Sequence, residues 1–333
     1  MTPPKLTIGI PTLNRPEMLQ QAIESCLKQT IPVHIVVADQ GHEPETAEVL
    51  RRYGDHPHVE HILTEATCLW ENWEAAALAC DTPYFAWLQD DDVVARGYAN
   101  RIVHSFERWP DVLHWQARCL LGKDAEWGAW WSWNGPMMPM QYLAGKPAAW
   151  EGTVIVPVMY LTSWALSPGV AFRCGEAFNS ALEQMPTHCD LFSERLILAY
   201  MGAQGRFAAD PVIAGQWIHH GQNESYKQHK NQEEQQKVCF EHLDKLMDTI
   251  EWGGAFQSWC EMIPVMNMLG MIQSAESIVT PHKEAIIKTM QKSLEGRIEV
   301  VKPTPKLDPA IAWEALGMPA LAPREMHGDL LVA

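Results

Sequence analysis

Short apolar segments alternate with amphipathic segments over the first ninety residues of the chain. Four apolar runs have the length of buried strands, at residues 6–10, 33–38, 59–63 and 83–88. After the first run, Leu19, Ile23 and Leu27 recur at four-residue spacing, which predicts a helix with one buried face. Segments 45–53 and 70–80 predict helices in the next two gaps. Strands that alternate with helices in this order predict a parallel sheet with right-handed crossovers.

Polar turns end three of the predicted strands, at residues 11–14, 39–42 and 89–92. Because parallel strands place their carboxyl ends at one edge of a sheet, we expect these turns to lie together. Ligands of open α/β sheets bind outside that edge. In the first turn, Asn14 is predicted to cap the following helix, and Pro16 suits its first turn.

The pattern changes after about residue 100. Helices are predicted at 102–109, 175–184, 190–201 and 228–252, and strands at 112–115 and 207–214. Residues 121–152 are rich in Gly, Pro and Trp and are predicted to be loop. Residues 256–293 are predicted to be mostly helical, with breaks at Pro264 and Pro281. Five prolines in the tail from Val301 favour an extended or partly disordered arm.

Three adjacent carboxylates, Asp90, Asp91 and Asp92, follow the apolar run that ends at Leu88. Carboxylates crowded at the end of a strand repel one another unless a cation lies between them. Oxygen ligands suit Mg²⁺ or Mn²⁺. The alternative is a solvated acidic turn, but such turns seldom lie directly against a hydrophobic strand. We therefore expect a divalent metal site here.

Composition narrows the classes of function. The chain has 333 residues, 47% of them hydrophobic, which is typical of a soluble globular protein with a proper core. A net charge of −16 argues against broad binding to the phosphate backbone of nucleic acids. The eight cysteines form no CxxC pair, and the sequence has neither an apolar signal core nor an 18-residue apolar run. We expect a cytoplasmic protein with reduced thiols and no integral membrane segment.

Four segments in order resemble one enzyme family. They are the opening strand and turn Ile8–Pro16, the second-strand segment Val36–Gly41, the helix Trp70–Trp73 and the acidic run after Leu88. Together they resemble family 2 of the glycosyltransferases, which have the GT-A fold, and the resemblance extends from Leu6 to Ser225. It implies an α/β protein with a Rossmann-like mixed sheet flanked by helices, followed here by a C-terminal helical extension. It also implies transfer of a sugar from a nucleotide-sugar, most simply a UDP-sugar, to a hydroxyl acceptor with inversion.

The resemblance implies a set of residues that contact the nucleotide: Pro11, Thr12, Asn14, Arg15, Asp39, Asn72, Asp90 and Asp91. Asp39 would accept the imide N–H of a uracil ring. The alternative for Asp39 is a turn aspartate bonded to nearby backbone N–H groups. Gln89 stands where many relatives carry the first aspartate, so Asp90 and Asp92 are expected to hold Mn²⁺ or Mg²⁺, with Asp91 able to substitute.

Two further clusters are similar to segments of the same family. Asp190, at a predicted helix start, is the expected catalytic base, and Glu194, one helical turn further on, is the second candidate. The alternative for Asp190 is a helix cap, where aspartate is favoured in any case. His220, with His219 as second choice, is expected to contact the metal or the diphosphate, and Ile218 replaces an arginine often found there.

Acceptor contacts are expected from Trp130, Trp131 and Gly169. Tryptophan can stack on a sugar or a base, although anchoring of a long loop is its commoner use. The turn at Gly169 could equally be a simple connection. The acceptor class stays open between a glycan, a cell-surface polymer, a protein and a modified nucleic-acid base.

We predict a GT-A domain over residues 1–228, with a nucleotide-binding half at 1–105 and an acceptor half at 106–228. A helical extension (229–300) follows, and then a Pro-rich tail (301–333). The Met-rich helices of the extension could form a homo-oligomer.

A dinucleotide-dependent dehydrogenase is excluded, because no GxGxxG turn follows the first strand. Two alternatives remain: a phosphatase with Asp90 as nucleophile and Asp92 as acid, and a non-catalytic nucleotide-sugar-binding module.

Overall fold

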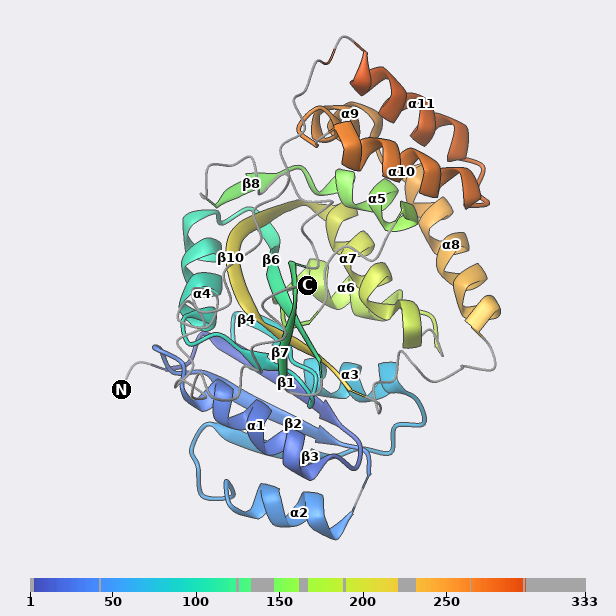
Figure 1. The fold of residues 1–333 in the computed structure, drawn as a ribbon. Coiled ribbons are helices and arrows are strands. Elements are labelled where there is room, and N and C mark those ends of the chain that lie inside the picture. The colour runs from blue at the N-terminus through green and yellow to red at the C-terminus, as the bar shows by residue number, and fades with distance from the viewer. Residues whose placement is uncertain are drawn as a thin grey trace.

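A mixed sheet with helices on both faces forms the centre of the molecule (Figure 1). The computed structural model describes residues 3–41, 43–123, 126–132, 147–161, 167–187, 190–220, 232–263, 265–295 and 297. Within these residues the sheet has ten strands, in the order β3-β2-β1-β4-β9-β6-β10-β5, with β7 beside β6 and β8 beside β10. The predicted α/β fold class is confirmed.

The first four strands are parallel, as the sequence predicts. They are β1 (Leu6–Thr12), β2 (His34–Asp39), β3 (Val59–Leu63) and β4 (Tyr84–Trp87). The connecting helices are α1 (Pro16–Leu27), α2 (Pro44–Arg51) and α3 (Leu69–Leu78). The predicted capping of α1 by Asn14 is wrong: the N-cap residue is Arg15, because Asn14 takes a left-handed conformation (φ 57°) one residue earlier.

The second half adds strands of both directions. Its strands are β5 (Val93–Val94), β6 (Val112–Lys123), β7 (Glu126–Ser132), β8 (Ala148–Trp150), β9 (Val170–Arg173) and β10 (Arg206–His219). Its helices are α4 (Tyr98–Arg108), the short η2 (Gly152–Val154), α5 (Ile155–Leu161), α6 (Glu176–Glu183), η3 (Asp190–Phe192) and α7 (Ser193–Gln204). Strand β9 runs antiparallel between β4 and β6, whereas β6 and β10 are parallel to each other. Strands β4, β6 and β10 therefore point the same way.

The prediction of a loop over residues 121–152 is wrong for three strands, because this segment contains the end of β6, the whole of β7 and the whole of β8. Strand β6 extends to Lys123, and Lys123 pairs with Glu126 at the start of the antiparallel strand β7. Tryptophan is a good strand former, and four of them lie at positions 127–133, so the Gly and Pro content of the wider segment misled the prediction.

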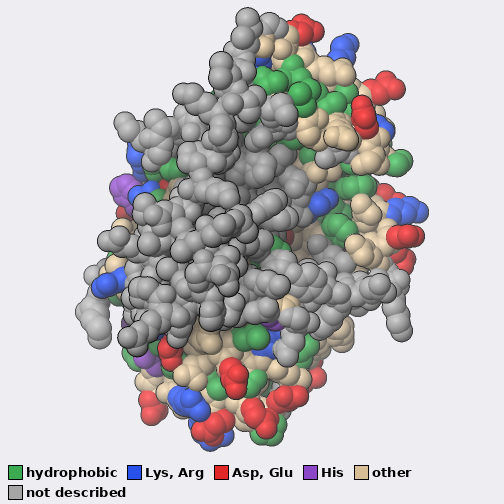
Figure 2. Space-filling model, viewed as in Figure 1, with side chains coloured by type: hydrophobic (Ala, Val, Ile, Leu, Met, Phe, Trp, Pro, Cys, Tyr) green, Lys and Arg blue, Asp and Glu red, His purple; other side chains and the backbone are tan. Residues whose placement is uncertain are grey.

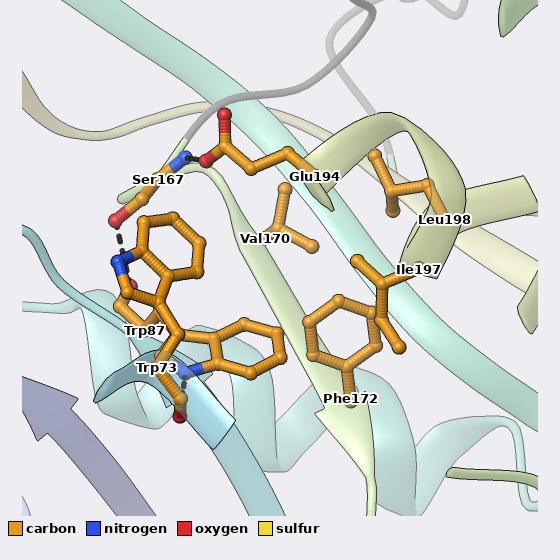
Figure 3. A pocket seen from close by; sticks show the side chains of 8 residues that line it. All are labelled: Trp73, Trp87, Ser167, Val170, Phe172, Glu194, Ile197 and Leu198. Carbon is orange, nitrogen blue, oxygen red and sulfur yellow. Dashed lines mark hydrogen bonds between the residues drawn. The ribbon is translucent and has the colours of Figure 1, made fainter. Parts of the chain in front are cut away.

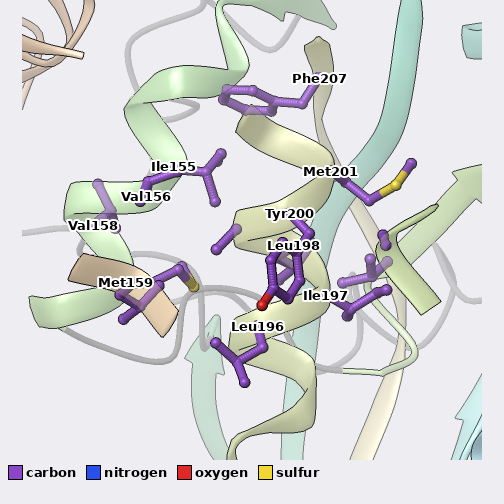
Figure 4. Close-up of a cluster of buried hydrophobic side chains, with 14 of the residues drawn as sticks. Ile155, Val156, Val158, Met159, Leu196, Ile197, Leu198, Tyr200, Met201 and Phe207 are labelled. Carbon is purple, nitrogen blue, oxygen red and sulfur yellow. The ribbon is translucent and has the colours of Figure 1, made fainter. Parts of the chain in front are cut away.

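Two hydrophobic clusters cover the two faces of the sheet. One lies between the sheet and α1 and α4, with Trp115 and Phe106 fully buried in it. The other lies between the opposite face and α3, α5 and α7. Figure 4 shows α5 and α7 side by side in this second cluster, with Ile155, Ile197 and Phe207 among the buried side chains.

The C-terminal extension packs onto this second face. Its helices are α8 (Gln232–Thr249), α9 (Gly253–Cys260), α10 (Val265–Ser277) and α11 (Lys283–Leu294), so the helices end and begin around the predicted breaks. The predicted boundary at residue 228 and the tail 301–333 lie outside the described residues. Among the helices that the structure describes, none is both long and apolar enough to cross a membrane.

Acidic and basic side chains are interspersed over the end of the molecule that carries α1, α2 and β3 (Figure 2). They include the exposed pairs Arg51–Glu48 and Lys28–Glu24. Exposed pairs of this kind contribute little to stability, so the candidate functional charges are the buried ones.

Candidate active site

The carboxyl ends of β1, β2, β4 and β10 bring the predicted polar residues to one edge of the sheet. Thr12 and Asp39 end the paired strands β1 and β2 and lie directly opposite each other. The acidic run follows β4, and His220 follows β10. Because these strands are parallel, segments more than two hundred residues apart in the sequence meet at this edge.

Asp90 is held by two groups from the turn after β1. Thr12 Oγ1 donates to Asp90 Oδ2 at 2.7 Å, and Arg15 Nη1 lies 3.0 Å from Asp90 Oδ1. The same Arg15 nitrogen lies 3.0 Å from Asp91 Oδ2. One guanidinium nitrogen thus bridges two neighbouring carboxylates, whose side chains are each 5% exposed.

Asp91 and Asp92 face the end of β10. His220 Nε2 lies 2.9 Å from Asp91 Oδ2, so Asp91, the predicted substitute ligand, is the carboxylate in contact with this histidine. The backbone N–H of Ile218 donates to Asp92 Oδ1 at 2.8 Å. Asp92 is 0% exposed, and its Oδ2 has no hydrogen-bond partner among the described residues.

Burial dominates the electrostatics of this cluster. It raises the pKa of Asp90 to about 6, against the opposing effect of Arg15, and the charge of Asp91 adds to the rise. Burial also raises the pKa of Asp92 well above its ordinary value, again with help from Asp91. The protein therefore holds these carboxylates close together at a cost in free energy, which a bound cation would offset.

Asp39 is almost fully buried at the end of β2. Its Oδ1 accepts the backbone N–H of Gly41 at 3.0 Å, as the turn-aspartate alternative required. Its Oδ2 lies 3.5 Å from Nε2 of His61 on β3. Each carboxylate oxygen has a second lone pair, so these contacts leave acceptor capacity for a ligand.

Asn72 is buried and forms three hydrogen bonds within the protein. Its Nδ2 donates to the backbone oxygens of Thr12 and Ala38, at 3.3 and 3.1 Å, and its Oδ1 accepts from Thr64 Oγ1 at 2.8 Å. Asn72 therefore ties α3 to the ends of β1 and β2, close to Asp39 and the acidic cluster.

The two candidate bases have different surroundings. Asp190 Oδ1 accepts the backbone N–H of Trp70 in the first turn of α3, so it caps that helix from a distant part of the chain. Glu194, in α7, accepts the backbone N–H of Ser167 at 2.9 Å. Burial raises the pKa of Glu194 to about 7, and the charge of Glu194 in turn adds to the raised pKa of Asp92.

Glu194 is one of the residues that line a mostly apolar pocket (Figure 3). The pocket holds about 250 Å³ of empty space, part of it continuous with solvent. Its other lining residues are Trp73, Trp87, Ser167, Val170, Phe172, Ile197 and Leu198. Trp87 ends β4 three residues before Asp90, so the pocket adjoins the acidic cluster.

A family model described as glycosyl transferase family 2 matches residues 7–150, which include β1 to β4 and the whole acidic run. The chain carries a glycosyl transferase family 2 domain. The predicted family and the predicted enzyme class, a glycosyltransferase, are confirmed by this match. The match supports transfer of a sugar from a nucleotide-sugar donor. Among curated protein sequences, none matches the chain significantly.

Solved structures of the same fold include the protein TarS of S. aureus. Residues 1–349 of TarS match with a TM-score of 0.52 and 11% identity, over 87% of this chain and 90% of that one. The structure of the same segment in complex with UDP-GlcNAc matches with a TM-score of 0.53 and 12% identity, over the same shares. At these identities the likeness shows the GT-A fold alone.

The acceptor residues predicted for this glycosyltransferase are only partly described. Gly169 precedes β9, and its carbonyl accepts the backbone N–H of Ala117 at 2.8 Å. Trp130 and Trp131 belong to β7, and their side chains lie outside the described part of the structure, as does that of His219. Pro11, which is also predicted to contact the nucleotide, is buried next to Thr12 in β1.

Sequence reasoning missed two residues of this edge. His61 lies beside Asp39 because β3 pairs with β2 in parallel; the signal was its place near the end of the third predicted strand. Ser167 binds Glu194 through its N–H and the backbone oxygen of Trp87 through its hydroxyl at 2.8 Å. Only the fold brings Ser167 to this edge, since β9 enters the sheet beside β4.

The residues of the glycosyltransferase site suit a divalent cation in their chemistry. Asp92 Oδ2 is buried and unpartnered among the described residues, and oxygen and imidazole ligands are those that Mn²⁺ accepts. In the described ranges, however, no group of three or more His, Cys, Asp or Glu side chains is arranged to hold a metal ion. Arg15 Nη1 lies 3.0 Å from one oxygen of Asp90 and 3.0 Å from one oxygen of Asp91.

Proposed function

We propose that this glycosyltransferase uses a UDP-sugar and a divalent cation to glycosylate a hydroxyl-bearing acceptor with inversion. The observation that carries the proposal is the buried carboxylate cluster at the carboxyl edge of the sheet, two of whose members have raised pKa values. The complex of S. aureus TarS with UDP-GlcNAc, a structure of the same fold, supports uridine as the base.

In this proposal Asp39 accepts the imide N–H of uracil with its remaining acceptor capacity. Pro11, Thr12 and Asn14 form the turn around the base, and Asn72 fixes the strand ends behind it. A purine is larger than uracil, so we expect a guanine nucleotide to fit less well between Asp39 and the turn after β1.

Asp91, Asp92 and His220 are the residues best placed to hold Mn²⁺ or Mg²⁺. Asp90 was expected to bind the metal together with Asp92. Its two oxygens, however, are bound by Thr12 and Arg15, so in this proposal it orients the donor instead. A bound cation supplies positive charge that offsets the charge on the departing nucleoside diphosphate.

Asp190 acts as the base in this proposal. The acceptor oxygen attacks the anomeric carbon while its proton passes to the Asp190 carboxylate, and the bond from that carbon to the diphosphate oxygen breaks. The hydrogen bond from Trp70 N–H, at 2.9 Å, orients the carboxylate. Glu194 is the second candidate, since a pKa of about 7 suits proton transfer near neutral pH.

The donor class is tested by thermal stabilisation with UDP, GDP and dTDP in the presence of Mn²⁺. UDP at about 100 times its Kd should stabilise the protein by about 2.7 kcal/mol, and GDP should have the smallest effect. Asp39→Asn should remove the preference for UDP, because an amide presents a donor as well as an acceptor to the base. No stabilisation by any of the three nucleotides would contradict the proposal.

The base is tested by three variants. Asp190→Asn keeps the helix cap, because asparagine caps as well as aspartate, but cannot take a proton. It should therefore preserve stability and lower kcat by at least about 100-fold. Asp190→Ala should in addition lose about 1 kcal/mol of stability, and Glu194→Gln should lower kcat less than Asp190→Asn. If Glu194→Gln is the more damaging change, Glu194 is the base.

A further inference from the structure

Arg15 bridges the carboxylates of Asp90 and Asp91 through one nitrogen, Nη1, at 3.0 Å from each. The Arg15 side chain is 15% exposed and both carboxylates are 5% exposed, so water screens this contact only weakly. In the free protein, therefore, a cation supplied by the chain itself already neutralises part of the acidic cluster.

The backbone aims Arg15 at this position. Asn14 takes a left-handed conformation, and Arg15 follows as the N-cap residue of α1, with Pro16 fixing the first turn. The carbonyl of Arg15 accepts the backbone N–H of Leu19, which anchors the residue to the helix. The guanidinium is thus held over the acidic run by the start of a helix and not by a flexible loop.

A divalent cation on Asp91 would compete with Arg15 for the same oxygen, Oδ2, which His220 also contacts. The two cations repel each other strongly in a site this poorly solvated. The diphosphate of a donor changes this balance, because it offers the guanidinium a new anionic partner with matching bidentate geometry.

We propose that Arg15 is an internal counter-cation that makes metal binding depend on the donor. It holds Asp91 while the site is empty and transfers to the diphosphate when the donor binds, which releases Asp91 for the metal. The inference rests on the proposed function, since it assumes a diphosphate at this edge. By linkage, the donor then raises the affinity for the metal by the same factor as the metal raises the affinity for the donor.

A purely structural ion pair makes the opposite prediction. If Arg15 only stabilises the turn after β1, its removal lowers the stability of the fold and leaves Asp90 bound to Thr12 and Asp91 in contact with His220, without improving their metal site. If Arg15 competes with the metal, its removal tightens metal binding in the absence of nucleotide.

The experiment measures Mn²⁺ binding by electron paramagnetic resonance, with and without saturating UDP. For the native protein we expect weak binding of Mn²⁺ alone and at least about tenfold tighter binding with UDP, a coupling of ordinary size. For Arg15→Gln we expect Mn²⁺ alone to bind about tenfold more tightly than to the native protein, and most of the UDP effect to disappear. Unchanged or weaker binding of Mn²⁺ to Arg15→Gln would overturn the inference.

Two further variants complete the test. Arg96→Gln removes the same charge from an exposed position four residues beyond Asp92 and should bind Mn²⁺ like the native protein. Arg15→Lys keeps the competing charge and should stay within about threefold of the native affinity for Mn²⁺ alone, so it serves if Arg15→Gln does not fold. Tighter Mn²⁺ binding by either variant would count against the inference.

The outcomes separate the inference from the proposed function. If UDP binds to no variant under any condition, the proposed function fails. If UDP binds but the affinity for Mn²⁺ is the same with and without it in the native protein, only the role of Arg15 fails. If Mn²⁺ binds to neither the native protein nor Arg15→Gln, even with UDP, the metal site and the role of Arg15 both fail.

Discussion

Glu194 and Asp90 are carboxylic acids that the fold holds partly protonated near neutral pH. Burial is the main cause in both, since it raises the pKa of Glu194 to about 7 and that of Asp90 to about 6. Each accepts hydrogen bonds from fixed groups, Ser167 N–H for Glu194 and Thr12 and Arg15 for Asp90, which limit the rise. Such pairs of perturbed acids in a cleft are typical of catalytic sites.

The raised pKa of Glu194 has a consequence for stability. An unfolded glutamate ionises near its ordinary pKa of 4.5, whereas the folded Glu194 keeps its proton until about pH 7. Between these values the folded state binds more protons than the unfolded state, so the free energy of unfolding falls as the pH rises from about 4.5 to about 7. Glu194→Gln should remove this part of the pH dependence, a change of about 3 kcal/mol across the window.

Urea unfolding at several pH values measures this difference. Glu183→Gln, at an exposed position in α6, is the matched control and should keep the native slope. Identical slopes for the native protein and Glu194→Gln would show that Glu194 ionises normally in the fold.

At the scale of the elements, the hydrogen bonds of Asn72 connect α3 to the carboxyl ends of β1 and β2. Asn72→Ala removes one hydrogen-bond partner from each of two backbone carbonyls and from the Thr64 hydroxyl, which should cost about 1–3 kcal/mol of stability. Because these groups lie next to Asp39, the proposed contact to the uracil ring, KM for the donor should rise more than kcat falls. Asn100→Ala, at an exposed position of α4, should change neither quantity. A native KM in Asn72→Ala would mean that the ends of β1 and β2 keep their positions without these hydrogen bonds.

The elements also show how far the sequence could be interpreted. Short apolar runs were enough to predict β1, β2 and β4, which are buried on both faces, and helical spacing of apolar residues was enough for the helices between the first four strands. These patterns were insufficient for β9, a four-residue strand between β4 and β6 whose place depends on long-range pairing. The identities of the site residues were predictable from the motifs. The contacts of Arg15 and the contact of Asp91 with His220 were not, because they depend on backbone angles, such as the left-handed φ of Asn14, that only the fold defines.

The whole molecule shares one core between the glycosyltransferase fold and the C-terminal helices. Cys239, Leu243 and Met247 of α8 belong to the same buried cluster as α5 and α7. Trp259 of α9 is 1% exposed, and its ring lies 6.4 Å from that of Phe207 in β10. The extension therefore completes the second face of the sheet and is not an independent appendage.

Trp259→Ala should lower the free energy of unfolding by about 3–5 kcal/mol, because it removes a large ring from a packed core. The transition should stay single, with far-UV circular dichroism and tryptophan fluorescence coinciding, since the helices and the sheet unfold together. Leu269→Ala, at a position 47% exposed in α10, should change stability by less than about 0.5 kcal/mol. Two separate transitions in the native protein would show that the extension folds by itself.

The turns after β1 and β2 interlock at Gly41. A Cβ atom on this residue would lie 1.7 Å from Oδ1 of Asn14 and 3.1 Å from the backbone nitrogen of Asn14. A larger residue at Gly41 therefore requires the Asn14 side chain to turn away, and it leaves little room against the backbone of the turn that leads to Arg15. Attempts to change the donor preference should therefore keep Gly41. They should vary His61 instead, which contacts Asp39 from the neighbouring strand β3.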